Sequence, residues 1–161
     1  MTRSFAALLI AALTLAGCGS DAAEVGCAPL PEQAAASAEG EPDALLWTGD
    51  EDLPAIAGVD QADLRQARFI VANVSSQDGL LLHLTDGARI GTWKILASDA
   101  MAFRTGRDDG ELATWTEGAP AEPVESVCVV PQPGDWLVEA DVTFADDAGS
   151  GAYFWRLIVS H

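Results

Sequence analysis

Residues 135–144, DWLVEADVTF, carry the clearest structural signal in this chain of 161 residues. Every second residue from Trp136 to Phe144 is apolar, and only Leu137 breaks the alternation. Because successive side chains of a β-strand point to opposite faces, this pattern predicts a strand with one buried face. A matching strand follows the loop 145–151, with Tyr153, Trp155, Leu157 and Val159 on one face and Phe154 and Ile158 on the other. We expect this second strand to be central or covered.

Shorter runs of the same kind precede this pair of strands. Turn-forming residues separate the runs expected as strands, which are 68–74, 80–84, 89–96, 101–104, 111–115 and 124–130. Asp86-Gly87 and Asp108-Asp109-Gly110 are each expected to close a β-hairpin. Residues 60–66 predict one short helix with Asp60 as its N-cap. The chain is therefore expected to form a mainly β domain at 44–161, either an antiparallel, immunoglobulin-like β-sandwich or a small barrel.

The composition excludes several classes of protein. The chain is 49% hydrophobic, which is enough to build a core and argues against disorder throughout. Its 25 Asp and Glu outnumber 8 Lys and Arg and give a formal net charge of −17. Such a charge repels nucleic-acid phosphates, so no nucleic-acid partner is expected.

The N-terminus carries a targeting signal. Arg3 precedes an apolar run, 5–13, that is too short to span a membrane and is typical of a signal peptide, which we place at 1–17. Leu15-Ala16-Gly17-Cys18 resembles the lipobox of bacterial lipoproteins. The resemblance implies cleavage before Cys18, a covalent lipid on that cysteine and, since Gly19 follows it, a place at the periplasmic face of the outer membrane. An ordinary signal peptide that contains a Cys by chance is the alternative.

Two further cysteines, Cys27 and Cys128, remain once Cys18 is assigned to the lipid. We expect them to form a disulfide, because an exported chain enters an oxidising compartment, and two free thiols are the alternative. Residues 18–43 are rich in Ala, Glu, Pro and Gly, which predicts a flexible tether. A bridge at Cys27 would leave only 19–26 free and would keep the domain close to the membrane.

The closing pair of strands carries a second resemblance. Pro133-Gly134-Asp135-Trp136, followed by alternating apolar residues and a last strand, is similar to the closing hairpin of immunoglobulin-like periplasmic modules, including the YtkA-like and FixH-like families. This resemblance favours the β-sandwich and assigns no function. Some of those modules handle copper through clustered His and Met, whereas His83, Met101 and His161 are isolated in this sequence.

No catalytic motif is evident in the chain. His83 lies within a run of leucines and is expected to be a solvent-facing or hydrogen-bonded structural residue. The loop acids at 50–52, 108–111 and 146–147 match no calcium-binding loop and are expected to be solvated surface charge. Trp47 and Trp115 lie beside polar loops, which makes them speculative ligand-binding residues, although burial is the expected state of both.

Three functional hypotheses remain. The first is a non-enzymatic, lipid-anchored β-sandwich that binds an envelope protein or a small ligand and carries no cofactor besides the lipid on Cys18. The second is a periplasmic module that handles copper or calcium, with His83, Met101 or the loop acids as ligands. The third is a small hydrolase, which requires a pocket that contains a titratable group of altered pKa.

Overall fold

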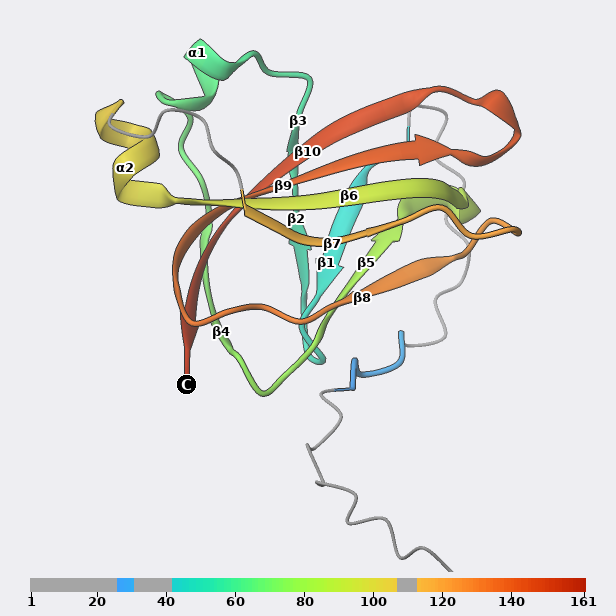
Figure 1. Ribbon diagram of the computed structural model, residues 1–161, viewed down its shortest axis with the longest axis horizontal. Coiled ribbons are helices and arrows are strands. Elements are labelled where there is room, and N and C mark those ends of the chain that lie inside the picture. The colour runs from blue at the N-terminus through green and yellow to red at the C-terminus, as the bar shows by residue number, and fades with distance from the viewer. Residues whose placement is uncertain (1–25, 31–41, 107–112) are drawn as a thin grey trace, which may run out of the picture.

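The computed structural model describes residues 26–30, 42–106 and 113–161, which form two facing β-sheets (Figure 1). The smaller sheet contains β1 (Ala44–Trp47), β2 (Asp52–Pro54), β5 (Leu80–Leu84) and β8 (Ser126–Val129), in the order β2-β1-β5-β8. The larger sheet contains β3 (Ile56–Ala57), β4 (Val71–Ser75), β6 (Ile90–Asp99), β7 (Ala113–Gly118), β9 (Gly134–Phe144) and β10 (Ser150–Ser160). Its order is β3-β10-β9-β6-β7, and β4 also pairs with β10. The sheets do not close into a barrel, so the expected β-sandwich is confirmed.

The predicted pair of alternating strands is the centre of the larger sheet. β9 and β10 run antiparallel in one continuous register, from Ser150 opposite Thr143 to Val159 opposite Gly134. The other edge of β10 is shared by β3, which is antiparallel, and β4, which is parallel. The expectation that the last strand is central is therefore confirmed.

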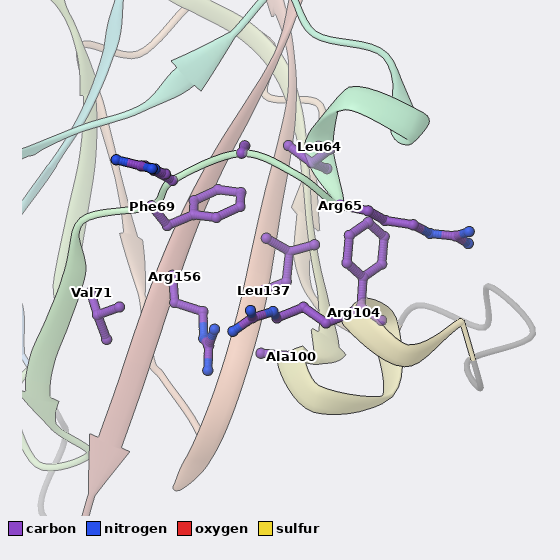
Figure 2. A pocket seen from close by; sticks show the side chains of 11 residues that line it. Leu64, Arg65, Phe69, Val71, Ala100, Arg104, Leu137 and Arg156 are labelled. Atoms are coloured by element: carbon purple, nitrogen blue, oxygen red, sulfur yellow. The ribbon is translucent and has the colours of Figure 1, made fainter.

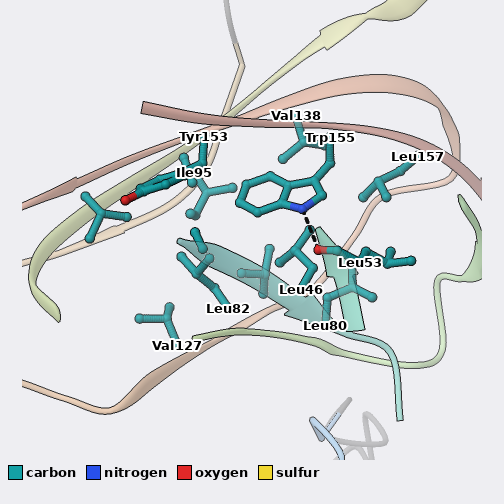
Figure 3. Packing of buried hydrophobic residues seen from close by; sticks show 14 of the residues in the cluster. Leu46, Leu53, Leu80, Leu82, Ile95, Val127, Val138, Tyr153, Trp155 and Leu157 are labelled. Carbon is teal, nitrogen blue, oxygen red and sulfur yellow. Dashed lines mark hydrogen bonds between the residues drawn. The ribbon is translucent and has the colours of Figure 1, made fainter. Parts of the chain in front are cut away.

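The main core lies between the two sheets (Figure 3). β9 and β10 contribute their alternating apolar residues, and Leu46, Leu53, Leu80 and Leu82 contribute from the smaller sheet. Trp155 is only 3% exposed, and its indole N–H donates a hydrogen bond to the carbonyl oxygen of Leu53 at 2.9 Å. This bond connects the sheets and satisfies a polar atom that burial would otherwise leave without a partner.

Leu137, the exception in the alternating pattern, belongs to a second small core on the outer face of the larger sheet. It is 4% exposed and clusters with Leu64, Ala100, Phe103 and Phe154. Two short helices, α1 (Gln61–Leu64) and α2 (Ala100–Thr105), supply three of these residues. β9 therefore breaks its alternation where these helices cover the sheet.

The predicted helix is confirmed in part, and the second helix corrects an expected strand. The Asp60 carboxylate accepts hydrogen bonds from the backbone N–H groups of Ala62 and Asp63, so it is the N-cap of α1. Residues 101–104 were expected to be a strand but lie in α2. The Asp99 side chain accepts from the Ala102 N–H at 2.7 Å, and Gly106 ends the helix in the left-handed conformation. These two caps favour a helix more strongly than the short apolar run at 101–104 favours a strand. The hairpin turn expected at 108–110 lies outside the described residues.

The hairpin expected at Asp86-Gly87 is wrong. The η1 turn (Thr85–Gly87) joins β5 to β6, and these strands belong to different sheets. Asp86 and Gly87 do have positive φ angles of 59° and 71°, as the dipeptide predicts. Local turn chemistry was therefore identified correctly, but the partners of the flanking strands are set by the core. A second turn, η2 (Ala145–Asp147), lies between β9 and β10.

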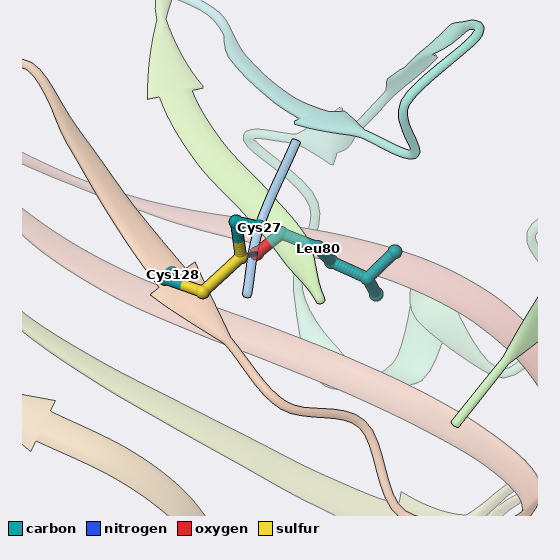
Figure 4. Close-up of a disulfide and its surroundings, with 3 residues drawn as sticks. All are labelled: Cys27, Leu80 and Cys128. Atoms are coloured by element: carbon teal, nitrogen blue, oxygen red, sulfur yellow. Dashed lines mark hydrogen bonds between the residues drawn. A yellow bond between two sulfur atoms is a disulfide. The ribbon is translucent and has the colours of Figure 1, made fainter. Parts of the chain in front are cut away.

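The predicted disulfide is confirmed (Figure 4). Cys27 and Cys128 are 101 residues apart in sequence and 5.7 Å apart between Cα atoms. Cys128 is exposed while its neighbours Val127 and Val129 point into the core, so the bridge lies on the outer face of the smaller sheet. Cys27 also forms an isolated parallel β-bridge with Gly79. The N-terminal segment is therefore fixed to the domain at Cys27.

The contact between Gly79 and the disulfide can be tested by substitution. A Cβ at Gly79 would lie 2.6 Å from the sulfur of Cys27 and 3.2 Å from that of Cys128, whereas a Cβ at Gly26 would meet nothing within 4 Å. We expect Gly79→Ala to destabilise the oxidised protein by about 1–3 kcal/mol, the usual cost of overpacking, and Gly26→Ala to melt close to wild type. Thermal unfolding measures both. The Cβ would also lie 3.2 Å from the backbone nitrogen of Cys27. Because the closest contact is with a sulfur, the Gly79→Ala penalty should become smaller when both cysteines are Ala, and an undiminished penalty in that background would contradict this explanation.

Candidate binding site

The two tryptophans considered as binding residues are partly buried. The ring of Trp115 meets that of Trp136 edge to face, with centroids 5.8 Å apart, and both rings pack against the main core. The indole N–H of Trp47 is buried and has no hydrogen-bond partner. Neither residue is among the exposed large apolar side chains of the described part of the chain, which are Ile70, Val71, Met101, Val130 and Ile158. Exposed apolar surface therefore lies elsewhere.

The structure does not bring His83 and Met101 together. His83 is 5% exposed, and its Nε2 lies 2.8 Å from Asp52 Oδ1 on the outer face of the smaller sheet. Met101 is 62% exposed on α2, which packs on the outer face of the larger sheet. Both sheets lie between the two residues. Within residues 26–30, 42–106 and 113–161, no three His, Cys, Asp or Glu side chains are placed to hold a metal ion.

A pocket of about 250 Å³ opens on the outer face of the larger sheet, beside α1 and α2 (Figure 2). Its apolar lining residues are Leu64, Ala67, Phe69, Val71, Ala100, Phe103 and Leu137. The pocket forms because the two helices pack on Leu137 while residues 65–70, which lead from α1 to β4, cross over the sheet beside them. It is therefore a direct product of the second small core.

Four arginines complete the lining of this pocket: Arg65, Arg68, Arg104 and Arg156. We call it the arginine pocket. These four are half of the eight basic residues in a chain of net charge −17, and none of the lining residues is acidic. Sequence reasoning missed the site, because the arginines come from the segment after α1, from α2 and from β10. The three-residue spacing of Arg65 and Arg68 was the only local signal.

The four guanidinium groups differ in their partners. Arg156 donates from Nε and Nη2 to the two carboxylate oxygens of Asp135, at 2.8 and 2.6 Å. These hydrogen bonds raise the pKa of Arg156 above its ordinary value, despite its partial burial. The guanidinium carbon of Arg65 lies 5.6 Å from the centre of the Phe103 ring, and Figure 2 shows its head group pointing away from the pocket. Two of the four are therefore already engaged within the protein.

Arg68 and Arg104 are the other two. Both are exposed, and neither makes a side-chain hydrogen bond or ion pair with any residue that the structure describes. In Figure 2 the Arg104 side chain extends from α2 in the direction of Arg156. These two cations can therefore accept an external anion without breaking an internal ion pair.

The carboxyl group whose pKa is altered, among the described residues, lies outside this pocket. Glu139 is on the outer face of β9, opposite Leu96 and Phe154 on the neighbouring strands. Burial raises its pKa, and the nearby charge of Asp141 raises it further. Glu139 does not line the arginine pocket, so it offers no acid or base for hydrolysis there.

No family model, curated protein or solved structure matches this chain. The shape and lining of the arginine pocket are therefore the main indication of a function.

Proposed function

We propose that this protein is a lipid-anchored, non-enzymatic binding module of the cell envelope that takes up its ligand in the arginine pocket. The observation that carries the proposal is the concentration of four arginines in the lining of one pocket in an otherwise strongly acidic chain. Ligand sites are typically concave and mostly apolar, with a few polar groups that converge on the ligand. The arginine pocket combines seven apolar side chains with four charged ones, and its lining offers no nucleophile, acid or base.

Two features support a place in the envelope. The lipobox-like sequence that ends at Cys18 lies outside the described residues and remains a sequence-based argument. The disulfide between Cys27 and Cys128 suits an oxidising compartment such as the periplasm. In the described part of the chain, no helix is long and apolar enough to cross a membrane. A lipid on Cys18 would be the means of attachment, by default to the periplasmic face of the outer membrane.

Lipidation can be tested with Cys18→Ser. We expect the full-length wild-type chain, expressed in a double-membraned bacterium, to partition into detergent and to carry a lipid on its N-terminal cysteine by mass spectrometry. Cys18→Ser should lose the lipid and leave the membrane fraction. The variant with Cys27→Ala and Cys128→Ala is the matched control, since it loses two other cysteines and should keep the anchor. An unmodified Cys18 in the wild type would overturn the anchor.

A further inference from the structure

We propose that the arginine pocket binds a small amphiphilic carboxylate, with Arg104 on the carboxylate and the apolar lining residues around its body. This inference rests on the proposed function, because it names the ligand class of that same site. Three observations carry it: the unpaired arginines, the apolar lining residues and the exposed apolar side chains that neighbour the lining residues in the sequence.

The unpaired arginines define the head group. A guanidinium presents its N–H donors in a planar fork that matches the two oxygens of a carboxylate. Arg156 shows this geometry within the protein, since it holds Asp135 through two hydrogen bonds. Arg68 and Arg104 line the same pocket and have no such partner among the described residues. The net charge of −17 repels a dianion more strongly than a monoanion, which favours a carboxylate over a phosphate.

The walls define the rest of the ligand. Phe69, Val71 and Leu137 line the cavity, and each CH₂ group that the ligand buries against their apolar atoms strengthens binding. The volume of about 250 Å³ is small for a ligand site, so the body must be compact. An acid without an apolar body would leave these walls in water, and an apolar body without an acid would leave Arg68 and Arg104 without an anion.

Of the five exposed large apolar side chains in the described residues, one lines this pocket and three lie within two residues of a lining residue in the sequence. Val71 lines it, Ile70 adjoins Val71, and Met101 adjoins the lining residue Ala100. Ile158 lies two residues from Arg156 on the same face of β10. Exposed apolar surface beside a pocket marks a binding site more often than scattered single residues do. This rim would contact the part of a longer ligand that projects from the pocket.

The test uses the full-length chain in nanodiscs of zwitterionic lipid, with empty nanodiscs as the blank. The probes are 3-phenylpropionate, the neutral 3-phenylpropanol, which shares its body, and acetate, which shares its head group. Titration calorimetry measures each at neutral pH. We expect saturable binding of 3-phenylpropionate, and affinities at least tenfold lower for the alcohol and for acetate, since each lacks one of the two recognised parts.

Charge-matched variants separate the pocket from the overall charge. Arg104→Gln should weaken 3-phenylpropionate binding about tenfold, because it loses charge-assisted hydrogen bonds to the carboxylate. Arg68→Gln should weaken binding less, because it removes only a positive charge from the pocket lining. Lys94→Gln removes the same charge from an exposed position outside the pocket and should leave the affinity unchanged. Thermal unfolding should show that all three variants are folded, as expected for exposed side chains.

Several outcomes would overturn the proposal. Equal binding of the acid and the alcohol would remove the role of the arginines, and equal weakening by Lys94→Gln and Arg104→Gln would reduce it to overall charge. Arg104-dependent binding to nanodiscs of anionic lipid, without binding of 3-phenylpropionate, would assign the site to a membrane surface instead. In each case the Cys18→Ser assay is unaffected, so failure of the ligand class is distinguishable from failure of the anchor.

Discussion

Replacing Cys27 and Cys128 together by Ala is expected to lower the free energy of unfolding by about 2–5 kcal/mol. The reason is the sequence separation of 101 residues, since a bridge that closes so long a loop removes much of the conformational freedom of the unfolded chain. A loss of this size is a large part of the total stability of a typical domain, about 5–15 kcal/mol. Chemical denaturation of the wild type and the double variant measures the difference.

The reduced wild-type protein is the control for this prediction. Because the effect comes from the covalent bond and not from the packing of the sulfurs, reduced wild type and the double variant should unfold at the same denaturant concentration. Both should unfold well below the oxidised wild type. If the double variant and the oxidised wild type unfold together, the bridge does not stabilise the fold as argued.

Trp155→Ala is expected to cost about 3–5 kcal/mol, the usual range for truncating a buried aromatic side chain. Trp155 is 3% exposed in the main core, so the substitution leaves a cavity between the sheets. It also removes the hydrogen bond to the Leu53 carbonyl oxygen and leaves that acceptor without its donor. Thermal or chemical unfolding would detect a loss of this size easily.

Two variants make this prediction specific. Ile158 is on the same strand, but its side chain is 40% exposed. We therefore expect Ile158→Ala to lower the free energy of unfolding by less than about 1 kcal/mol. Trp155→Phe keeps an aromatic ring but loses the indole N–H, so its stability should lie between those of wild type and Trp155→Ala. Similar losses for Trp155→Ala and Ile158→Ala would mean that the core does not depend on this tryptophan.

The sequence predicts those parts of the fold that are determined by a residue's immediate neighbours. The alternation in 135–144 predicts β9, because one face of that strand is buried over its whole length. Leu137 departs from the pattern because α1 and α2, far away in sequence, cover the other face. Asp86-Gly87 has the backbone angles expected of a hairpin turn, yet it connects two sheets. Which strands pair is decided by the whole core and not by the turn between them.

Local sequence patterns could not predict the candidate site, because the arginines that line it come from distant parts of the sequence. Arg65 and Arg68 are close in sequence, but Arg104 and Arg156 join them only when α2 and β10 are in place. The helix that carries Arg104 was expected to be a strand, although Asp99 and Gly106 are recognisable helix caps. A correct assignment of α2 would still not have placed Arg104 near Arg156, because that proximity depends on how the helix packs on the sheet.

The position of β10 has a consequence for the order in which the chain can fold. β3 and β4 are made early, but their partner in the larger sheet is β10, about 90 residues later in the sequence. Sheets whose pairs are so distant in sequence fold slowly, since the intervening loop must close before any contact stabilises it. The larger sheet therefore cannot be completed during synthesis until β10 has been made. Up to that point the larger sheet stays incomplete, which would suit the export across a membrane that the proposed function requires.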